Sequence, residues 1–268
     1  MRRGLDSRRF EEKIMNDTVI KRDITRLWNK EYKNYDNCYA HGIKSDNEKR
    51  EWLRLLDSLI EKKPGEVLDV GAGTGFVSLL LAELGHSCKG LDLSENMLSL
   101  ARKKAQDAGF DKVCFALGDA EDTQEPEEKY DVVINRHLVW TLPHPEKALA
   151  DWRRVLKPGG KLIVLEGNWH YNRPLDRASV FLGKCLQSIQ EQRNAFSKED
   201  DSYDKLKKEL PMMQSKNAKR LSQMVENAGF SITVIPLKAV DKAEKKAMPL
   251  VYRLLNPHKR IAVIGVKE

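Results

Sequence analysis

The sequence predicts an α/β fold in which a parallel sheet is flanked by helices. Short apolar runs alternate with segments that carry apolar residues at three- and four-residue spacing, from residue 66 to residue 166. This alternation is typical of β–α–β units, whose strands run parallel. A glycine-rich turn, residues 71–75, follows the first apolar run. The length of 268 residues is sufficient for one α/β domain with an added lobe.

The expected elements follow one another along the chain. Two helices, residues 18–33 and 46–61, come first, and Trp52, Leu56 and Leu59 give the second one an apolar face. Ser94 is a suitable N-cap for the helix after the second strand. The expected strands are residues 66–70, 87–91, 113–117, 130–135, 161–166, 231–237 and 259–266, and the other expected helices are residues 74–84, 94–108, 145–156, 176–195 and 217–227.

The pattern divides the chain into four parts. Residues 1–63 are expected to form an N-terminal helical cap, which includes an irregular aromatic lid at residues 35–42, and residues 64–171 the ligand-binding core. The strand–helix alternation stops in residues 172–215, where we expect a helical insertion over the substrate site. Residues 216–268 complete the sheet, and their two strands are expected to form a hairpin-like edge.

The composition is that of a soluble protein, with 41% hydrophobic and 32% charged residues. No apolar run approaches the roughly 20 residues of a membrane helix. The basic N-terminus has no apolar segment behind it and therefore does not resemble a secretory signal. Met15 is an alternative start, which would make the preceding residues a disordered leader. The sequence leaves the oligomeric state open between monomer and homodimer.

The cysteines and histidines do not predict a metal site. Four widely spaced cysteines, without a C-x-x-C pair, indicate reduced and mostly buried thiols in a cytoplasmic protein. Cys88 and Cys114 lie in apolar strand-like runs, where a small core residue is the expected role. The six histidines are scattered and show no metal-ligand spacing.

The net charge of +7 raises the question of a nucleic-acid partner. From Lys184 onward there are 17 lysines and arginines against 10 acids, so the whole excess lies in the C-terminal third. These basic residues alternate with acids and show no dense basic stripe with aromatic platforms, which a nucleic-acid groove requires. We therefore expect a solvated helical surface and no nucleic-acid partner.

The glycine turn is the first candidate for a ligand site. Glycines let the backbone bend sharply and approach a ligand without a Cβ atom in the way. Asp92 ends the second expected strand, 21 residues after Gly71, where a carboxylate can accept hydrogen bonds from two ribose hydroxyls. Nicotinamide-binding folds share both features, so the turn and Asp92 leave an oxidoreductase open.

Two further features favour a different ligand. The glycine spacing is G-x-G-x-G, whereas the dinucleotide fingerprint is G-x-G-x-x-G. Asp69 lies in the first strand near the turn, where it would repel a pyrophosphate and attract a cationic sulfonium with an α-amino group. Taken alone, Asp69 is equally well a structural acid. After the third strand, Asp119 and Ala120 offer a carboxylate and an amide to an adenine edge.

Four motifs in order carry a family resemblance: residues 67–75, Gly90-Leu91-Asp92-Leu93-Ser94 with Met97, Gly118-Asp119-Ala120, and residues 154–160. Together they resemble the class I S-adenosylmethionine-dependent methyltransferases, most closely the small-molecule enzymes of the UbiE-like or type 11 kind. The resemblance covers residues 52–166 and, more weakly, the rest of the chain to the last strand. It implies a Rossmann-like, doubly wound sheet of seven mostly parallel strands with an antiparallel last strand.

The resemblance implies S-adenosylmethionine as cofactor, S-adenosylhomocysteine as product, and a role for each matching residue. Gly71 and Gly73 would lie against the methionine part and Asp92 at the ribose. Met97 would lie beside the adenosine, and Asp119 with Ala120 at the adenine. The expected cofactor contacts are Asp69, Gly71, Ala72, Gly73, Thr74, Asp92, Leu93, Met97, Asp119, Ala120, Asn135 and Arg136.

The methyl acceptor is expected at the carboxyl ends of the fourth and fifth strands. Family members that methylate amino groups of bases often carry Asn-Pro-Pro-Tyr after the fourth strand, whereas this chain has Asn135-Arg136-His137-Leu138, which favours a small-molecule acceptor. His137 is the candidate general base, because imidazole titrates near neutral pH, and a structural histidine is the alternative. Trp140 is a second candidate here, although core packing is its commoner role. The candidate acceptor contacts are Tyr39, His41, Trp140, Asn168, Trp169 and His170.

The sequence thus predicts a methyltransferase that acts on an N, O, S or C nucleophile. A sulfonium is already a good leaving group, so alignment and exclusion of water can perform most of the catalysis. Two alternatives remain at this stage. One is a nicotinamide-dependent oxidoreductase on the same kind of fold, and the other is a non-catalytic cofactor-binding protein.

Overall fold

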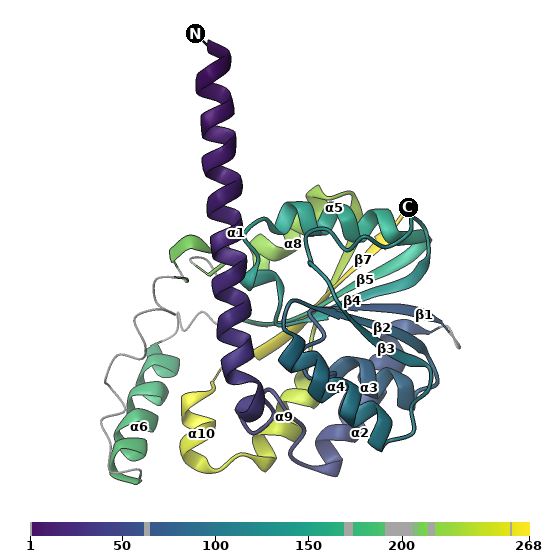
Figure 1. Cartoon of the computed structure of the whole chain (residues 1–268). Helices are drawn as coiled ribbons and strands as arrows, with labels where there is room; N and C mark the ends of the chain where they lie inside the picture. Colours follow the sequence, from purple (N-terminus) through teal and green to yellow (C-terminus); the bar gives the residue numbers. More distant parts are fainter. Residues whose placement is uncertain are drawn as a thin grey trace.

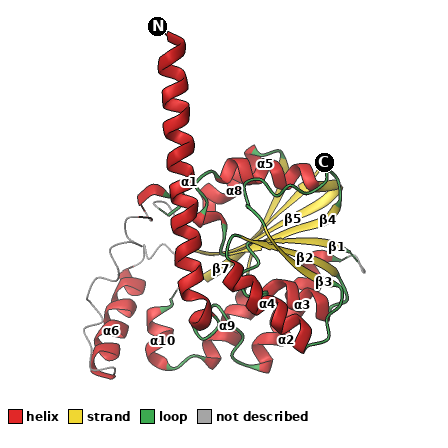
Figure 2. Ribbon diagram, viewed as in Figure 1, coloured by secondary structure: helices red, strands yellow, loops and turns green. Residues whose placement is uncertain are grey.

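A computed structural model gives a seven-stranded sheet with helices on both faces (Figures 1 and 2). It describes residues 2–61, 65–168, 174–190, 206, 208–213, 218–257 and 259–268, and only the backbone of residues 2–16 and Asn168. The strands are β1 (Glu66–Val70), β2 (Ser87–Asp92), β3 (Val113–Leu117), β4 (Tyr130–Arg136), β5 (Leu156–Asn168), β6 (Phe230–Pro236) and β7 (Lys259–Lys267).

The strand order is β3-β2-β1-β4-β5-β7-β6. The pairs from β3 to β5 are parallel, whereas β7 is antiparallel to both β5 and β6. The predicted doubly wound sheet with an antiparallel last strand is therefore confirmed. This order places the carboxyl ends of β1, β2, β3 and β4 at one edge, where a ligand site is expected.

Helices cover the two faces of the sheet in two groups. One face carries α2 (Asp46–Ile60), α3 (Phe76–Glu83) and α9 (Lys238–Ala247), and the opposite face carries α5 (Pro145–Val155) and α8 (Ala218–Asn227). Helix α4 (Glu95–Asp107) packs on β2 and β3. The other helical elements are α1 (Arg2–Tyr35), the short helix η1 (Val139–Thr141), α6 (Pro174–Gln190) and α10 (Leu250–Leu255).

The continuous apolar strands follow from this double cover. In β4, Val132 and Ile134 are buried against α2 and α3, and Val133 is buried on the α5 face. Successive side chains of a strand point to opposite faces, so a strand covered on both sides needs apolar residues at every position. Ser94 caps α4 as expected, because its hydroxyl accepts the backbone N–H of Met97 at 3.2 Å.

The C-terminal region departs from the expected elements. The last two strands are antiparallel neighbours, as expected for a hairpin-like edge, but α9 and α10 lie between them. Helix α6 packs on α10, where the Ser179 hydroxyl donates to the backbone oxygen of Leu254 at 2.9 Å. Much of the predicted insertion at residues 172–215 lies outside the described residues, and the division of the chain into four parts stays a prediction. In the described part of the chain, no helix is long and apolar enough to cross a membrane.

The expectation of mostly buried cysteines is wrong. All four are free thiols, but Cys88 is buried whereas Cys38 and Cys114 are exposed. Cys114 lies on β3, the edge strand of the sheet, whose outer face is not fully covered. An apolar run in the sequence therefore does not show whether a strand lies at the edge or in the centre of the sheet.

Candidate active site

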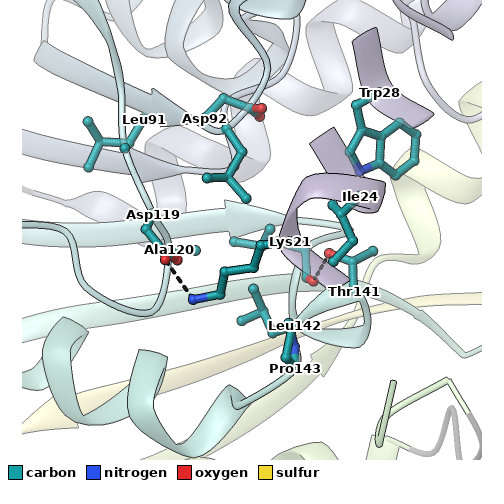
Figure 3. A pocket seen from close by; sticks show the side chains of 14 residues that line it. Lys21, Ile24, Trp28, Leu91, Asp92, Asp119, Ala120, Thr141, Leu142 and Pro143 are labelled. Atoms are coloured by element: carbon teal, nitrogen blue, oxygen red, sulfur yellow. Dashed lines mark hydrogen bonds and ion pairs between the residues drawn. The ribbon is translucent and has the colours of Figure 1, made fainter. Parts of the chain in front are cut away.

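The predicted cofactor residues converge on one pocket at the carboxyl edge of the sheet (Figure 3). The loops that follow β1, β2, β3 and β4 each contribute to its wall. The pocket encloses about 470 Å³, including its open mouth. Of the predicted contacts, those that line it are Gly71, Asp92, Leu93, Asp119 and Ala120.

The glycine turn bends sharply, as expected, and does so through left-handed backbone at its glycines. Gly71, Gly73 and Gly75 have φ angles of +71°, +54° and +82°. The turn is fixed by backbone bonds from Gly71 and Ala72 to the carbonyl of Leu91, at 2.8 and 2.9 Å. A Cβ atom on Gly71 would lie 2.7 Å from the side chain of Leu138, whereas one on Gly73 would meet nothing within 4 Å. The missing side chain of Gly73 therefore leaves space beside the backbone.

Asp92 is bound to the same turn. One carboxylate oxygen accepts the backbone N–H of Gly73 at 2.9 Å, and the other accepts that of Ser94 at 2.8 Å. Burial raises the pKa of Asp92, although these backbone bonds favour the charged form. Its carboxylate is thus held at the pocket wall, where its remaining lone pairs can accept further donors.

Asp69 lies buried below the turn. One of its oxygens accepts both the backbone N–H and the hydroxyl of Ser78, at 3.0 and 2.6 Å, near the start of α3. Burial raises its pKa to about 6 despite these bonds. The structural role that the sequence left open is therefore present, and contact with a ligand stays a prediction.

Asp119 is engaged by a residue that the sequence did not indicate. One oxygen accepts the backbone N–H of Glu121 at 2.9 Å, and the other lies 2.6 Å from the ammonium of Lys21 on α1 (Figure 3). Lys21, Ile24 and Trp28 form one wall of the pocket. No sequence signal could have found this wall, because Lys21 and Asp119 are 98 positions apart. Met97, predicted beside the adenosine, is buried at the start of α4.

Thr74 joins the turn to the lid rather than lining the pocket. Its hydroxyl donates to Asp36 at 2.6 Å, and its backbone oxygen accepts the ammonium of Lys104 at 3.0 Å. The same ammonium pairs with the other oxygen of Asp36. The chain then turns tightly, because a Cβ on Gly42 would lie 2.2 Å from the backbone oxygen of Asp36. Asp36 is thus a site residue that the aromatic lid segment contained but its pattern did not single out.

Arg136 also binds the lid in this structure. Its guanidinium donates to the backbone oxygens of Ala40 and His41 and lies against the rings of Trp52 and Phe76. Burial lowers its pKa to about 10, so the group remains charged at neutral pH. The structure therefore places Arg136 under residues 40–41, outside the wall of the pocket.

His137 and Glu166 form a buried pair at the ends of the adjacent strands β4 and β5. The Nδ1 atom of His137 lies 3.6 Å from a carboxylate oxygen of Glu166, and the side chains are 4% and 7% exposed. His137 has a φ angle of +58°, a strained conformation for a residue with a side chain. Such strain is often retained at functional sites, and here it directs the imidazole toward Glu166.

The lid places a second imidazole beside this pair. The rings of His41 and His137 are 6.3 Å apart, and Tyr35 stacks on His41 at 4.4 Å. Burial, together with Arg136, lowers the pKa of His41 to about 4, so that imidazole is neutral at pH 7. The amide of Asn135 is fully buried, and within the described part of the chain neither of its polar atoms has a hydrogen-bond partner.

Three of the remaining candidates, Trp140, Tyr39 and Asn168, lie among the described residues. Trp140 is half-buried and packs against the core on the α5 face, which is its commoner role. The ring of Tyr39 lies 4.8 Å from that of Tyr252. Asn168 ends β5 opposite Lys259, and Trp169 and His170 lie outside the described residues.

Comparison with known proteins agrees with this geometry. Residues 68–164 match the family model described as a methyltransferase domain. The chain is 30% identical over 190 residues to the ubiquinone/menaquinone biosynthesis C-methyltransferase UbiE of Vibrio vulnificus, covering 69% of this chain and 71% of that one. It is 32% identical over 156 residues to the demethylmenaquinone methyltransferase of Bacillus subtilis, covering 57% and 66%.

A solved structure supports the fold at lower identity. The phosphoethanolamine N-methyltransferase 2 of Haemonchus contortus, in complex with phosphomonomethylethanolamine and S-adenosylhomocysteine, superimposes with a TM-score of 0.57 at 19% identity. The alignment covers 81% of this chain, which spans about half of the other one (53%).

Proposed function

Because the chain belongs to the class I S-adenosylmethionine-dependent methyltransferases, in the group of the UbiE enzymes, we propose that His137, oriented by Glu166, deprotonates its small-molecule acceptor. The same membership confirms the predicted cofactor, S-adenosylmethionine, and the predicted class of enzyme. The nicotinamide alternative is not favoured. What we propose is the role of each residue and the chemical class of the acceptor.

The pocket residues fit this cofactor. Gly73 leaves room that a Cβ atom would fill, so the backbone of the turn can lie directly against a ligand. The fixed carboxylate of Asp92 would accept the ribose hydroxyls, and Asp119 the amino group of the adenine. The buried amide of Asn135, at the end of β4, would hold the methionine part.

Methyl transfer requires the protein to align the reactants, exclude water and accept a proton. When bound, the cofactor supplies a methyl group on a sulfonium, which is a good leaving group. The chain holds the reactants in line through the loops after β1 to β4. The lid, tied down by Asp36 and Arg136, excludes water. His137 accepts the proton that the acceptor loses.

The His137–Glu166 pair is the observation that carries the base assignment. Glu166 faces Nδ1, and a carboxylate there favours the tautomer that carries its proton on Nδ1. The Nε2 atom is then the proton acceptor. Both residues sit at strand ends on the ligand edge of the sheet, which is the position a catalytic pair requires.

The acceptor that best suits this site is neutral and weakly acidic, such as a hydroxylated quinone-like ring. His41 is neutral at pH 7, and the guanidinium of Arg136 is bonded to the lid, so neither of these two residues supplies a charge for an ionic acceptor. The names of the two relatives point to quinone rings and, for UbiE, to carbon as the nucleophile. Deprotonation of a ring hydroxyl raises the electron density on the neighbouring ring carbon, which would then take the methyl group. The proton of that carbon, and the proton held by His137, would pass to solvent as the product leaves the site.

Two experiments test the proposal. Calorimetric titration with S-adenosylhomocysteine should give saturable binding, and no binding at hundreds of micromolar would contradict the cofactor site. Labelled S-adenosylmethionine is then incubated with the protein and an extract of the native cell. Label in a hydrophobic, redox-active product supports the acceptor class, whereas label in a water-soluble amine would contradict it.

A further inference from the structure

Helix α1 and the turn that follows it cross the whole ligand edge of the sheet. Asp36 bonds the loop after β1 through Thr74, and Asn29 accepts the hydroxyl of Ser94, after β2, at 2.6 Å. Lys21 pairs with Asp119, after β3. Asp17 lies 2.8 Å from the imidazole of His144, in the connection from β4 to α5. Figure 1 shows the C-terminal half of α1 lying against α4, at this edge.

Lys21 is the charged centre of this crossing. Its ammonium lies 2.6 Å from Asp119 and 2.6 Å from Glu121, so it bridges two carboxylates. The side chains of Lys21 and Asp119 are 24% and 31% exposed, so salt can screen this bridge, although the side chain of Glu121 is only 3% exposed. Burial alone would lower the pKa of Lys21, but the two carboxylates raise it. Figure 3 shows the lysine reaching from α1 across the pocket wall.

We propose that Lys21 is a positioning residue that fixes Asp119 toward the adenine and fastens α1 over the pocket, so that cofactor and product pass the α1 side of the pocket only when this ion bridge opens. This inference rests on the proposed cofactor site. Lys21, Ile24 and Trp28 line the pocket together, so a ligand cannot pass their side of it while the bridge holds α1 in place.

The bridge remains closed in both the free and the bound protein. Each carboxylate oxygen has two lone pairs, and the oxygens of Asp119 each have one partner. An adenine amino group therefore adds to Asp119 without displacing Lys21. A bridge that is present in both the free and the bound protein slows cofactor association and dissociation together. A bridge present in only one of these states would instead change the affinity.

The test is stopped-flow binding of S-adenosylhomocysteine, with Trp28 as the fluorescent reporter in the pocket wall. Lys21→Met should raise both the association and the dissociation rate by about tenfold, the expected effect of losing a partly buried charged bridge. Lys21→Arg, which can still span two carboxylates, should restore slow exchange. Arg22→Met is the matched control, because Arg22 is 55% exposed and pairs only weakly with Asp23, at 3.6 Å.

A second measurement needs no variant. S-adenosylhomocysteine carries no net charge, so salt has little effect on its diffusion to the pocket. Raising the ionic strength should therefore speed both rates in the unmodified protein by weakening the bridge.

Unchanged rates in Lys21→Met, or a faster dissociation with unchanged association, would overturn the inference. A complete failure of the unmodified protein to bind would instead contradict the proposed function.

Discussion

The hydroxyl of Thr74 donates to the carboxylate of Asp36 at 2.6 Å, which ties the lid to the glycine turn. The Thr74 end of this bond is buried, at 1% exposed, whereas the side chain of Asp36 is 29% exposed. Lys104 completes the contact by binding both Asp36 and the backbone oxygen of Thr74. The lid and the glycine turn therefore hold each other in position through this contact.

Lys104→Met should loosen this contact without touching the pocket. We expect the Michaelis constant for S-adenosylmethionine to rise a few-fold and the unfolding free energy to fall by about 1 kcal/mol. Hydrogen exchange should quicken in residues 36–42, because the lid loses its charged anchor. Lys103→Met is the control, since the side chain of Lys103 is 69% exposed and its ammonium lies 3.8 Å from Asp107. Equal effects from both variants would show that the contact has no special role.

Asp92→Ala should weaken binding of S-adenosylhomocysteine by about 1–3 kcal/mol, the cost of leaving two ribose hydroxyls without their acceptor. Titration calorimetry measures this directly. Part of the loss arises from the turn, because the N–H of Gly73 also loses its partner. Asp107→Ala, on the exposed side of α4, provides the control. An unchanged affinity in Asp92→Ala would refute the ribose role.

His137→Asn should lower kcat by about 10²–10⁴-fold, the usual contribution of a general base. Asparagine tolerates the left-handed backbone at this position, so folding should be preserved. Binding of S-adenosylhomocysteine should not change, which separates this role from cofactor contact. Glu166→Gln should lower kcat less and shift the pH–rate profile, because it alters the orientation and basicity of the imidazole. A kcat that remains within threefold in His137→Asn would leave His137 a structural residue.

The central sheet and the glycine turn were predictable because their signals are local. A continuous apolar run such as residues 132–134 identifies a strand covered on both faces, and glycines identify a left-handed turn. Asp92 follows from its place at the end of a strand. These features depend on a few neighbouring residues and on the regular alternation of strand and helix.

The covering elements were not predictable in the same way. Lys21, Asn29 and Asp36 meet the sheet loops across 98, 65 and 38 positions, and no local pattern indicates which residue of a helix will reach a given loop. Helix α9 was missed because it is short and rich in lysine, with small apolar contacts such as Ala243. Arg136 follows β4 in sequence, but its long side chain reaches the lid carbonyls instead of the pocket.

Asp69 should make the stability of the cofactor-free protein depend on pH. Its pKa is about 6 in the fold against an ordinary value of 3.8, so at pH 5 the folded chain retains a proton that the unfolded chain has lost. Stability therefore falls as the pH rises from about 4 to about 6. Asp69→Asn should be more stable than the original protein at pH 7.5, by about 3 kcal/mol, and should bind S-adenosylmethionine more weakly.

Urea unfolding at pH 4 and pH 7.5 measures this difference, which should shrink at the lower pH because Asp69 is then protonated in the folded state and partly protonated in the unfolded chain. Asp111→Asn, at an exposed position, is the control. If Asp69→Asn is the less stable protein at pH 7.5, the buried charge does not carry the cost assigned to it.

Gly73→Ala provides the sharpest separation of binding from folding. A Cβ at this position would meet no atom of the described residues within 4 Å, so the expected stability cost is the strain of a φ angle of +54°, about 1 kcal/mol. The same Cβ would occupy the space against which the cofactor is expected to lie. We therefore expect a folded protein whose affinity for S-adenosylhomocysteine falls at least tenfold.

Gly85→Ala is a matched control for this experiment. Gly85 also has a positive φ, +88°, and also has free space around its Cβ position, but it lies after α3, away from the pocket. Both variants should lose similar thermal stability, and only Gly73→Ala should lose binding. If the two bind S-adenosylhomocysteine equally well, the open space at Gly73 is not the place where the cofactor lies, and the glycine turn serves the fold alone.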